Sequence, residues 1–313
     1  MPDTEPSCSI FAILARDRRS AAVLRRGPSK QVQLIRWWLT SDTFEEGQWF
    51  KGRIYERRCD LSPNGERFVY FAQDFGRAPG SWTAVSKPPF LTALALWPKG
   101  DCWGGGALFE DETTLLLNHR PGGESEIDRN YRLPKRFKVR QLGDHSGWGE
   151  DDPINHYRLV RDGWRHLQEG HARRAAGSAR LSYPFDPIEI YAKAHPGKQP
   201  IDLLQVTLGL GVTNGPWYKQ VYALLPKRQR EPDSRLQLDD VERQAQLFLA
   251  DCCWADWAPN GDLLYAQGGK LFRLKAARKK PPQQVWHGEP VLLADWTASR
   301  FQALAPTQDA SRW

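Results

Sequence analysis

A short turn motif that occurs twice constrains the fold of this chain more than any other feature. Residues 57–73 read RRCDLSPNGERFVYFAQ and residues 254–267 read WADWAPNGDLLYAQ, so a Ser/Ala-Pro-Asn-Gly turn precedes an apolar run in both. Asn-Gly pairs tolerate the positive φ angles of tight hairpin turns. We therefore predict that Gly65 and Gly261 lie at equivalent hairpin corners.

The second copy of the motif continues into a further strand. After DLLYAQ, a Gly-Gly turn leads into KLFRLK, residues 270–275. As a strand, this run places Leu271, Arg273 and Lys275 on one side and the apolar pair Phe272 and Leu274 on the other. Two tight turns thus join three consecutive strands. This pattern predicts an antiparallel meander over residues 252–275.

Two looser copies suggest that the motif is part of a repeat. Residues 93–118 place the sequence WPKG at the turn, and residues 290–306 keep a strand, an Asp-Trp pair and a second strand without the Pro-Gly. Gly65 and Gly100 are 35 residues apart, and the interval from Gly65 to Gly261 fits five steps of about 39 residues. Periods of ~20–50 residues are typical of propellers and other repeat proteins.

The middle of the chain, residues 119–250, carries hairpin signals without a clean copy of the turn. The Asp-Gly pair within residues 157–168 predicts a two-residue hairpin, and the Asn-Gly pair within residues 202–226 predicts another. Residues 238–250 have apolar side chains at helical spacing and equally fit a loop that leads into a strand.

The turn, the apolar strand, the second glycine-containing turn and the next strand together resemble the repeat of WD-type and TolB-like β-propellers. The resemblance rests on residues 57–73 and 252–275, with weaker support from residues 93–118 and 290–306. It implies an all-β fold, a single propeller domain over residues 1–313 with about five to seven four-stranded antiparallel blades. The N-terminal strand SIFAILAR would pair with the last blade and close the ring, because closure removes exposed sheet edges.

Composition bounds the compartment and the partners. The N-terminus is acidic where a secretory signal is positive, and the apolar run of residues 10–15 is too short for a membrane span, so we expect a cytoplasmic protein without membrane insertion. The five cysteines are scattered without a C-x-x-C pair, which predicts buried free thiols. The formal charge of +7 permits an acidic partner without requiring one.

The stretch QLGDHSGWGEDDPINHYR, residues 141–158, is the most suggestive place for chemistry. It lacks the G-x-S-x-G of a hydrolase, the spacing of a calcium loop and the H-E-x-x-H of a zinc helix, so we expect no catalytic residue, no metal and no cofactor. It does hold Trp148 between two glycines, where an indole is more useful at a surface than in a core. With His145 and Trp164, this indole would form an anchor for a partner.

Two further residues complete the candidate binding set. His119 follows a predicted strand and precedes a long polar loop, so we expect it at the rim of the fold. Arg165 beside Trp164 could contact phosphate while the indole stacks on a base.

The sequence favours a non-enzymatic interaction or scaffold protein that binds another protein through blade-connecting loops. The alternatives are a hydrolase-like enzyme with residues gathered at the propeller channel, and a nucleic-acid or anionic-surface binder.

Overall fold

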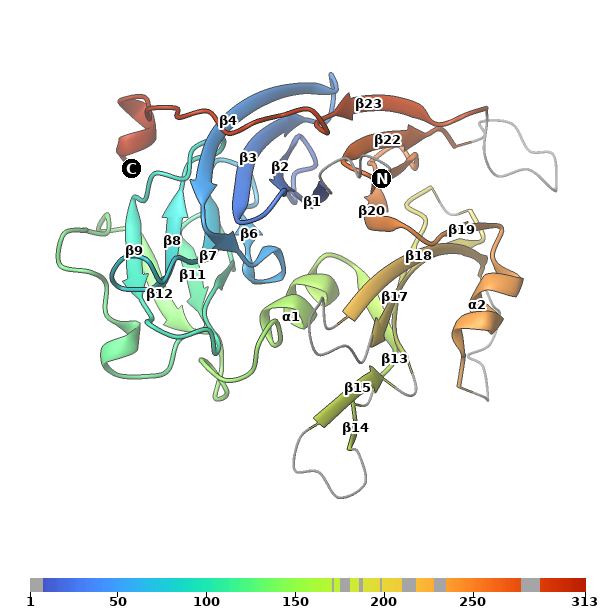
Figure 1. Cartoon of the computed structure of the whole chain (residues 1–313), viewed down its shortest axis with the longest axis horizontal. Helices are drawn as coiled ribbons and strands as arrows, with labels where there is room; N and C mark the ends of the chain where they lie inside the picture. Colours follow the sequence, from blue (N-terminus) through green and yellow to red (C-terminus); the bar gives the residue numbers. More distant parts are fainter. Residues whose placement is uncertain are drawn as a thin grey trace, which may run out of the picture. The chain divides into compact units, whose positions relative to one another are not determined.

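The computed structural model describes most of the chain, namely residues 8–170, 172–174, 181–185, 188–197, 199–209, 218–227, 235–276 and 288–313. Two compact units are present: unit 1 comprises Met1–Arg158 and Asp295–Trp313, and unit 2 comprises Leu159–Ala294 (Figure 1). Strands dominate both units, and the two α-helices, α1 (Ile154–Arg161) and α2 (Leu238–Gln244), are short. The prediction of an all-β fold is confirmed.

Three sheets build unit 1, and each is formed by strands that follow one another in the chain. The first sheet contains β1 (Ser9–Leu14), β2 (Ser20–Arg26), β3 (Gln31–Trp38) and β4 (Thr43–Lys51). The second contains β5 (Arg53–Ile54), β6 (Asp60–Leu61), β7 (Phe68–Gln73), β8 (Ser81–Ser86) and β9 (Ala95–Pro98). The third contains β10 (Ala107–Phe109), β11 (Thr114–Leu117) and β12 (Lys138–Gln141), with β12 parallel to β11. The connections hold the 3-10 helices η1 (Glu56–Arg58), η2 (Gly123–Ser125) and η3 (Asp309–Ser311).

Apolar side chains fill the space between consecutive sheets of unit 1. In β7, Phe68 and Tyr70 belong to the core that includes Leu34 of the first sheet, whereas Val69 belongs to the core that includes Phe109 of the third. Neighbouring side chains of a strand point to opposite faces, so β7 is buried on both faces. Burial on both faces explains the uninterrupted apolar run FVYFA, which alternation alone would not predict.

Unit 2 contains two larger sheets and one hairpin. The five-stranded sheet contains β13 (Trp164–Gln168), β16 (Glu189–Ala194), β17 (Ile201–Gly209), β18 (Tyr218–Pro226) and β19 (Leu247–Leu249). The four-stranded sheet contains β20 (Cys252–Trp257), β21 (Leu263–Gln267), β22 (Lys270–Leu274) and β23 (Val291–Asp295), and the hairpin pairs β14 (Ala172–Arg174) with β15 (Leu181–Phe185). One core combines Tyr191 and Tyr222 of the five-stranded sheet with Trp257 of the four-stranded sheet. A second core includes Val241 of α2, which lies against β18.

The two Ser/Ala-Pro-Asn-Gly turns are equivalent in the structure. Gly65 has a φ of 75° and Gly261 has a φ of 86°. Their N–H groups donate to the carbonyl oxygens of Ser62, at 2.8 Å, and Ala258, at 2.9 Å. The turns join β6 to β7 and β20 to β21, so the prediction of equivalent hairpin corners is confirmed. The meander predicted over residues 252–275 is also confirmed, as β20, β21 and β22.

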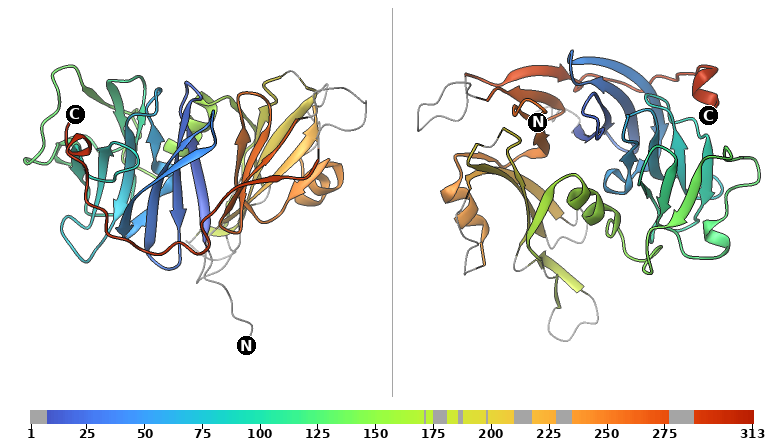
Figure 2. Two further views of the ribbon diagram at one scale, coloured as in Figure 1. Left: turned by 90° about the horizontal axis from the view of Figure 1, so that it is seen from above. Right: turned by 180° about the vertical axis from the view of Figure 1, so that it is seen from behind.

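The two looser copies of the motif are not hairpin corners, and that prediction is wrong. The first two residues of WPKG end β9, which pairs with β8 in the second sheet, whereas β10 pairs with β11 in the third. The segment between β9 and β10 therefore connects two sheets. In residues 290–306 the structure has β23 but no second strand. The polypeptide after β23 crosses β4 instead, where the side-chain amide of Gln48 donates to Leu304 O at 3.0 Å (Figure 2).

The hairpin predicted for residues 157–168 is also wrong, because the first half of that segment is helical. The Asp-Pro pair before α1 and the Gly after it are helix start and stop signals. Asp152 Oδ1 accepts the N–H of His156 in the first turn at 3.1 Å, and Gly163 has a φ of 90° just beyond the helix. Only the second half of the segment, β13, is a strand.

The other predictions for the middle of the chain hold where the structure tests them. Residues 238–250 combine both interpretations, since α2 is followed by β19. β17 and β18 pair antiparallel as predicted for residues 202–226, and the Asn-Gly pair of that hairpin, residues 214 and 215, lies outside the described ranges.

The N-terminal strand belongs to the first sheet. β1 pairs with β2 from Ser9 opposite Arg26 to Leu14 opposite Ala21, and the last sheet has the order β20-β21-β22-β23. The predicted pairing of β1 with the last sheet is therefore not observed, because β1 and β2 form a local hairpin whose apolar face contributes to the first core. Within the described part of the chain, no sheet closes on itself.

Candidate interaction site

The predicted binding residues divide between the two units. His119, His145 and Trp148 lie in loops of unit 1, whereas Trp164 and Arg165 lie on β13 of unit 2. Trp164 is 4% exposed and packs in the core of unit 2, and Arg165 forms an ion pair of 2.8 Å with Asp202 of β17 in the same five-stranded sheet. The indole of Trp164 is thus a core residue, and the candidate site develops around the three residues of unit 1.

Trp148 lies at the surface of unit 1, in the loop between β12 and α1. Its side chain is 59% exposed, and the guanidinium of Arg120 lies 4.3 Å from the centre of its ring. Gly147 and Gly149 on either side both have a φ of 80°, a conformation that glycine adopts without steric cost. The two glycines therefore set the direction of the chain on both sides of an indole that faces solvent.

A second exposed indole lies on an adjacent loop, and sequence reasoning missed it. The Trp103 side chain is 56% exposed, and the backbone N–H of Trp103 donates to Asp101 Oδ1 at 3.0 Å. The next residue, Gly104, donates its N–H to Gly149 O at 2.7 Å. The N–H of Gly147 donates to the Asn118 side chain at 2.8 Å, so hydrogen bonds to backbone groups hold both tryptophan loops together.

Close packing of glycines reinforces this connection. A Cβ atom on Gly104 would lie 2.5 Å from Gly147 Cα, and one on Gly105 would lie 2.4 Å from the Phe71 ring. Gly104, Gly105 and Gly106 all have positive φ. The absence of side chains in this glycine run therefore permits the close approach of the neighbouring backbone and ring. We refer to the segments 99–106 and 143–150 as the tryptophan loops.

His119 is fully buried beneath the surface that carries these loops, so the prediction that it lies at a rim is wrong. Its Nδ1 lies 2.7 Å from Glu124 O, so Nδ1 carries the proton and Nε2 accepts the hydroxyl hydrogen of Thr83 at 2.8 Å. Thr83 Oγ1 in turn accepts the N–H of Gly106 at 2.8 Å. Burial lowers the pKa of His119 to about 4, so the imidazole is neutral at pH 7 and its role is to position the loops.

A buried lysine connects the first tryptophan loop to η2. The Lys99 side chain is fully buried, and its Nζ lies 2.8 Å from Asp101 Oδ1 and 2.9 Å from Glu124 Oε2. Burial acts to raise the pKa of Asp101, but hydrogen bonds from Lys99 and from the Trp103 N–H outweigh it and hold this pKa below its ordinary value. The same carboxylate thus binds a buried cation and fixes the backbone that carries Trp103.

Among the residues that the structure describes, no three His, Cys, Asp or Glu side chains are grouped so that they could hold a metal ion. The longer α-helix has eight residues, whereas ~20 are needed to cross a bilayer, so no helix in the described ranges could span a membrane.

No protein-family model matches the chain, and no curated protein matches it either.

Proposed function

We propose that this chain is a non-enzymatic interaction protein that binds a protein partner through the tryptophan loops. The observation that carries the proposal is the exposure of two indoles, 56% for Trp103 and 59% for Trp148, on loops joined through their glycine backbones. Tryptophan is enriched among the residues that dominate binding energies. Loops that are already rigid lose little conformational entropy when a partner binds.

The surroundings of the indoles fit the anatomy of an interface. Aromatic residues and Arg are enriched at the centre of protein interfaces, and polar groups form the rim. Arg120 stacks on Trp148, while Asp101 and the exposed His145 lie on the two tryptophan loops. This arrangement combines apolar area with hydrogen-bonding groups that can orient a partner.

Retention of a partner from the native host tests the proposal. We expect the wild-type chain to retain a protein that Trp103→Ala and Trp148→Ala lose. Trp38→Ala is the matched control, because Trp38 is another indole of unit 1 under a guanidinium, that of Arg36 at 4.0 Å. If all three variants retain the same proteins as the wild type, the tryptophan loops are not the binding surface. Salt-dependent retention of single-stranded nucleic acid would favour the nucleic-acid alternative instead.

We also propose that the five sheets with three or more strands are the blades of a single β-propeller domain. Apart from the β14-β15 hairpin inserted between β13 and β16, each sheet is built from strands consecutive in the chain, and within each unit apolar cores lie between consecutive sheets, as blades of a propeller would require. Small-angle X-ray scattering tests this. A closed domain of 313 residues should have a radius of gyration of about 20 Å. A clearly larger radius with two maxima in the distance distribution would indicate two separate bodies.

We place the protein in the cytoplasm. All five cysteines are free, with Cys59 and Cys252 buried, and a reducing compartment keeps thiols in this state. Fractionation of the native host is the measurement, and recovery of the chain from a secreted or membrane fraction would contradict this placement.

A further inference from the structure

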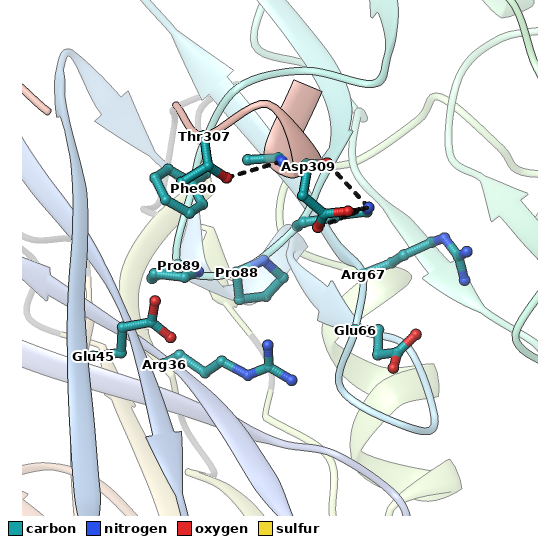
Figure 3. A pocket seen from close by; sticks show the side chains of 11 residues that line it. Arg36, Glu45, Glu66, Arg67, Pro88, Pro89, Phe90, Thr307 and Asp309 are labelled. Atoms are coloured by element: carbon teal, nitrogen blue, oxygen red, sulfur yellow. Dashed lines mark hydrogen bonds and ion pairs between the residues drawn. The ribbon is translucent and has the colours of Figure 1, made fainter. Parts of the chain in front are cut away.

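A pocket of about 450 Å³ lies in unit 1 (Figure 3). The strand pairing places it at the strand ends remote from the tryptophan loops. In the pairing of β7 with β8, Phe68 lies opposite Ser86 at one end and Gln73 opposite Ser81 at the other. Arg67, just before β7, and Lys87, just after β8, line the pocket and lie next to the first of these ends. Ser81 O, at the second end, accepts the N–H of Lys99, where the first tryptophan loop begins. The pocket is therefore a separate feature of the unit.

Charges of both signs line this pocket. Arg36 of β3 lies opposite Glu45 of β4 in the strand register, and Glu66 faces the pocket from the loop before β7. Burial lowers the pKa of Arg36, while the nearby carboxylates of Glu45 and Glu66 act to raise it, so all three charges influence one another. Stacking on Trp38, 4.0 Å from ring centre to guanidinium carbon, fixes the Arg36 side chain.

Of the three positively charged residues that line the pocket, Arg36, Arg67 and Lys87, the last already has a carboxylate partner in the chain. Lys87 Nζ donates to Asp309 O at 3.0 Å and lies 3.1 Å from Asp309 Oδ2. Arg67 Nη1 donates to the carbonyl of Glu112 at 3.3 Å, which leaves its positive charge without a carboxylate within 4.0 Å in the described part of the chain. With Lys87 neutralised, the remaining charged residues of the lining are Arg36 and Arg67, which are positive, and Glu45 and Glu66, which are negative.

An apolar wall completes the pocket. The segment 88–90, Pro-Pro-Phe, borders it and is held against β4, where the Gln48 N–H donates to Pro89 O at 3.0 Å. A Cβ atom on Gly47 would lie 1.9 Å from the same carbonyl oxygen, so this wall packs tightly on the strand. A ligand with an apolar group could therefore lie against a rigid surface.

We propose that this pocket binds a small zwitterion that carries an ammonium and a carboxylate group, either a free amino acid or a short peptide. The carboxylate would contact Arg36 and Arg67, and the ammonium would contact Glu45 and Glu66. Balanced charges favour a dipolar ligand, because a simple anion such as phosphate meets the two carboxylates as well as the guanidinium groups. The volume lies within the ~300–1,000 Å³ typical of small-molecule sites.

Isothermal titration calorimetry with four probes tests the proposal: leucine, Gly-Leu, N-acetyl-leucinamide and inorganic phosphate. We expect leucine or Gly-Leu to bind with a millimolar or lower Kd, and the preferred one distinguishes a free amino acid from a peptide. The blocked leucinamide and phosphate should bind at least tenfold more weakly. Phosphate that binds as well as the better zwitterion, or no saturation by either zwitterion below ~10 mM, would overturn the proposal.

Two variants separate charge recognition from loss of folding. Arg36→Gln should weaken zwitterion binding at least tenfold. Glu66→Gln, at an exposed residue, should weaken zwitterion binding tenfold but leave phosphate binding unchanged or stronger. Arg77→Gln, which removes an exposed pair with Asp74, should change neither affinity. Unchanged zwitterion binding in Glu66→Gln would show that its carboxylate does not hold an ammonium group.

Discussion

A Cβ atom on Gly104 would lie 2.5 Å from the Cα of Gly147, and this contact joins the two loops that expose Trp103 and Trp148. The position excludes side chains for two reasons, because Gly104 also has a φ of 66°. Both glycines are buried, whereas the neighbouring indoles are exposed, and the contact between the glycines determines where the indoles lie. The interaction surface therefore depends on the glycines beside it.

Gly104→Ala should destabilise the protein by about 2–5 kcal/mol, the sum of the cost of a left-handed backbone for Ala and of overpacking against Gly147. Gly268→Ala is the matched control, since Gly268 has a similar φ of 57° but open space where its Cβ would be. This control should lose only ~1–2 kcal/mol. Chemical denaturation of both variants measures the difference. Equal losses would show that the contact with Gly147 is not tight.

A buried ion pair of unit 2, between Lys193 and Asp256, should be costly to break. Lys193 Nζ lies 2.6 Å from Asp256 Oδ1, and both residues are buried. Asp256→Ala leaves a buried cation without a partner and should cost about 3–5 kcal/mol in the free energy of unfolding. Asp251→Ala removes the partner of Lys219 in an exposed pair and should cost less than ~1 kcal/mol. Similar losses in the two variants would contradict the assigned burial.

His119 should make stability depend on pH between about 4 and 6.5. Burial lowers its pKa to about 4 in the folded state, below the ordinary value of 6.5, so the unfolded chain binds more protons in this window. Stability from this residue is therefore complete above pH 6.5 and is lost as the pH falls towards 4, by up to ~3 kcal/mol. Denaturation curves of wild type and His119→Gln at several pH values measure this. A pH slope that is the same in both proteins would rule out His119 as its source.

The Ser/Ala-Pro-Asn-Gly motif predicted the local structure more reliably than any other feature of the sequence. Asp60 and Asp256 stand at the same offset before the two turns, and both carboxylates bind groups of a neighbouring sheet, the Phe109 N–H for Asp60 and the Lys193 ammonium for Asp256. Turn chemistry could be predicted because Asn-Gly acts through its own backbone. The helix α1 was missed because the Asp-Gly pair that follows it was interpreted as a hairpin, although Asp-Pro before it signals a helix start.

The candidate site was only partly predictable, because tertiary contacts assemble it. The glycines around Trp148 predicted an exposed indole, and the structure shows one. The same reasoning could have selected Trp103, which precedes three glycines, but nothing local indicates that the two loops meet. His119 appears polar and exposed in the sequence, whereas hydrogen bonds to Thr83 and Glu124 satisfy it in the interior.

The affinity and the stability of Trp148→Ala, measured on the same preparation against the partner that the wild type retains, test the central claim most directly. We predict that affinity falls ~30-fold or more, which corresponds to ~2 kcal/mol, because an exposed indole contributes chiefly in the complex. The melting temperature should stay nearly unchanged, since in the free protein the indole stacks on Arg120 and is otherwise solvated, a contact of ~1 kcal/mol at most. A loss of ~3 kcal/mol or more in stability with unaltered affinity would contradict the account and make Trp148 a packing residue.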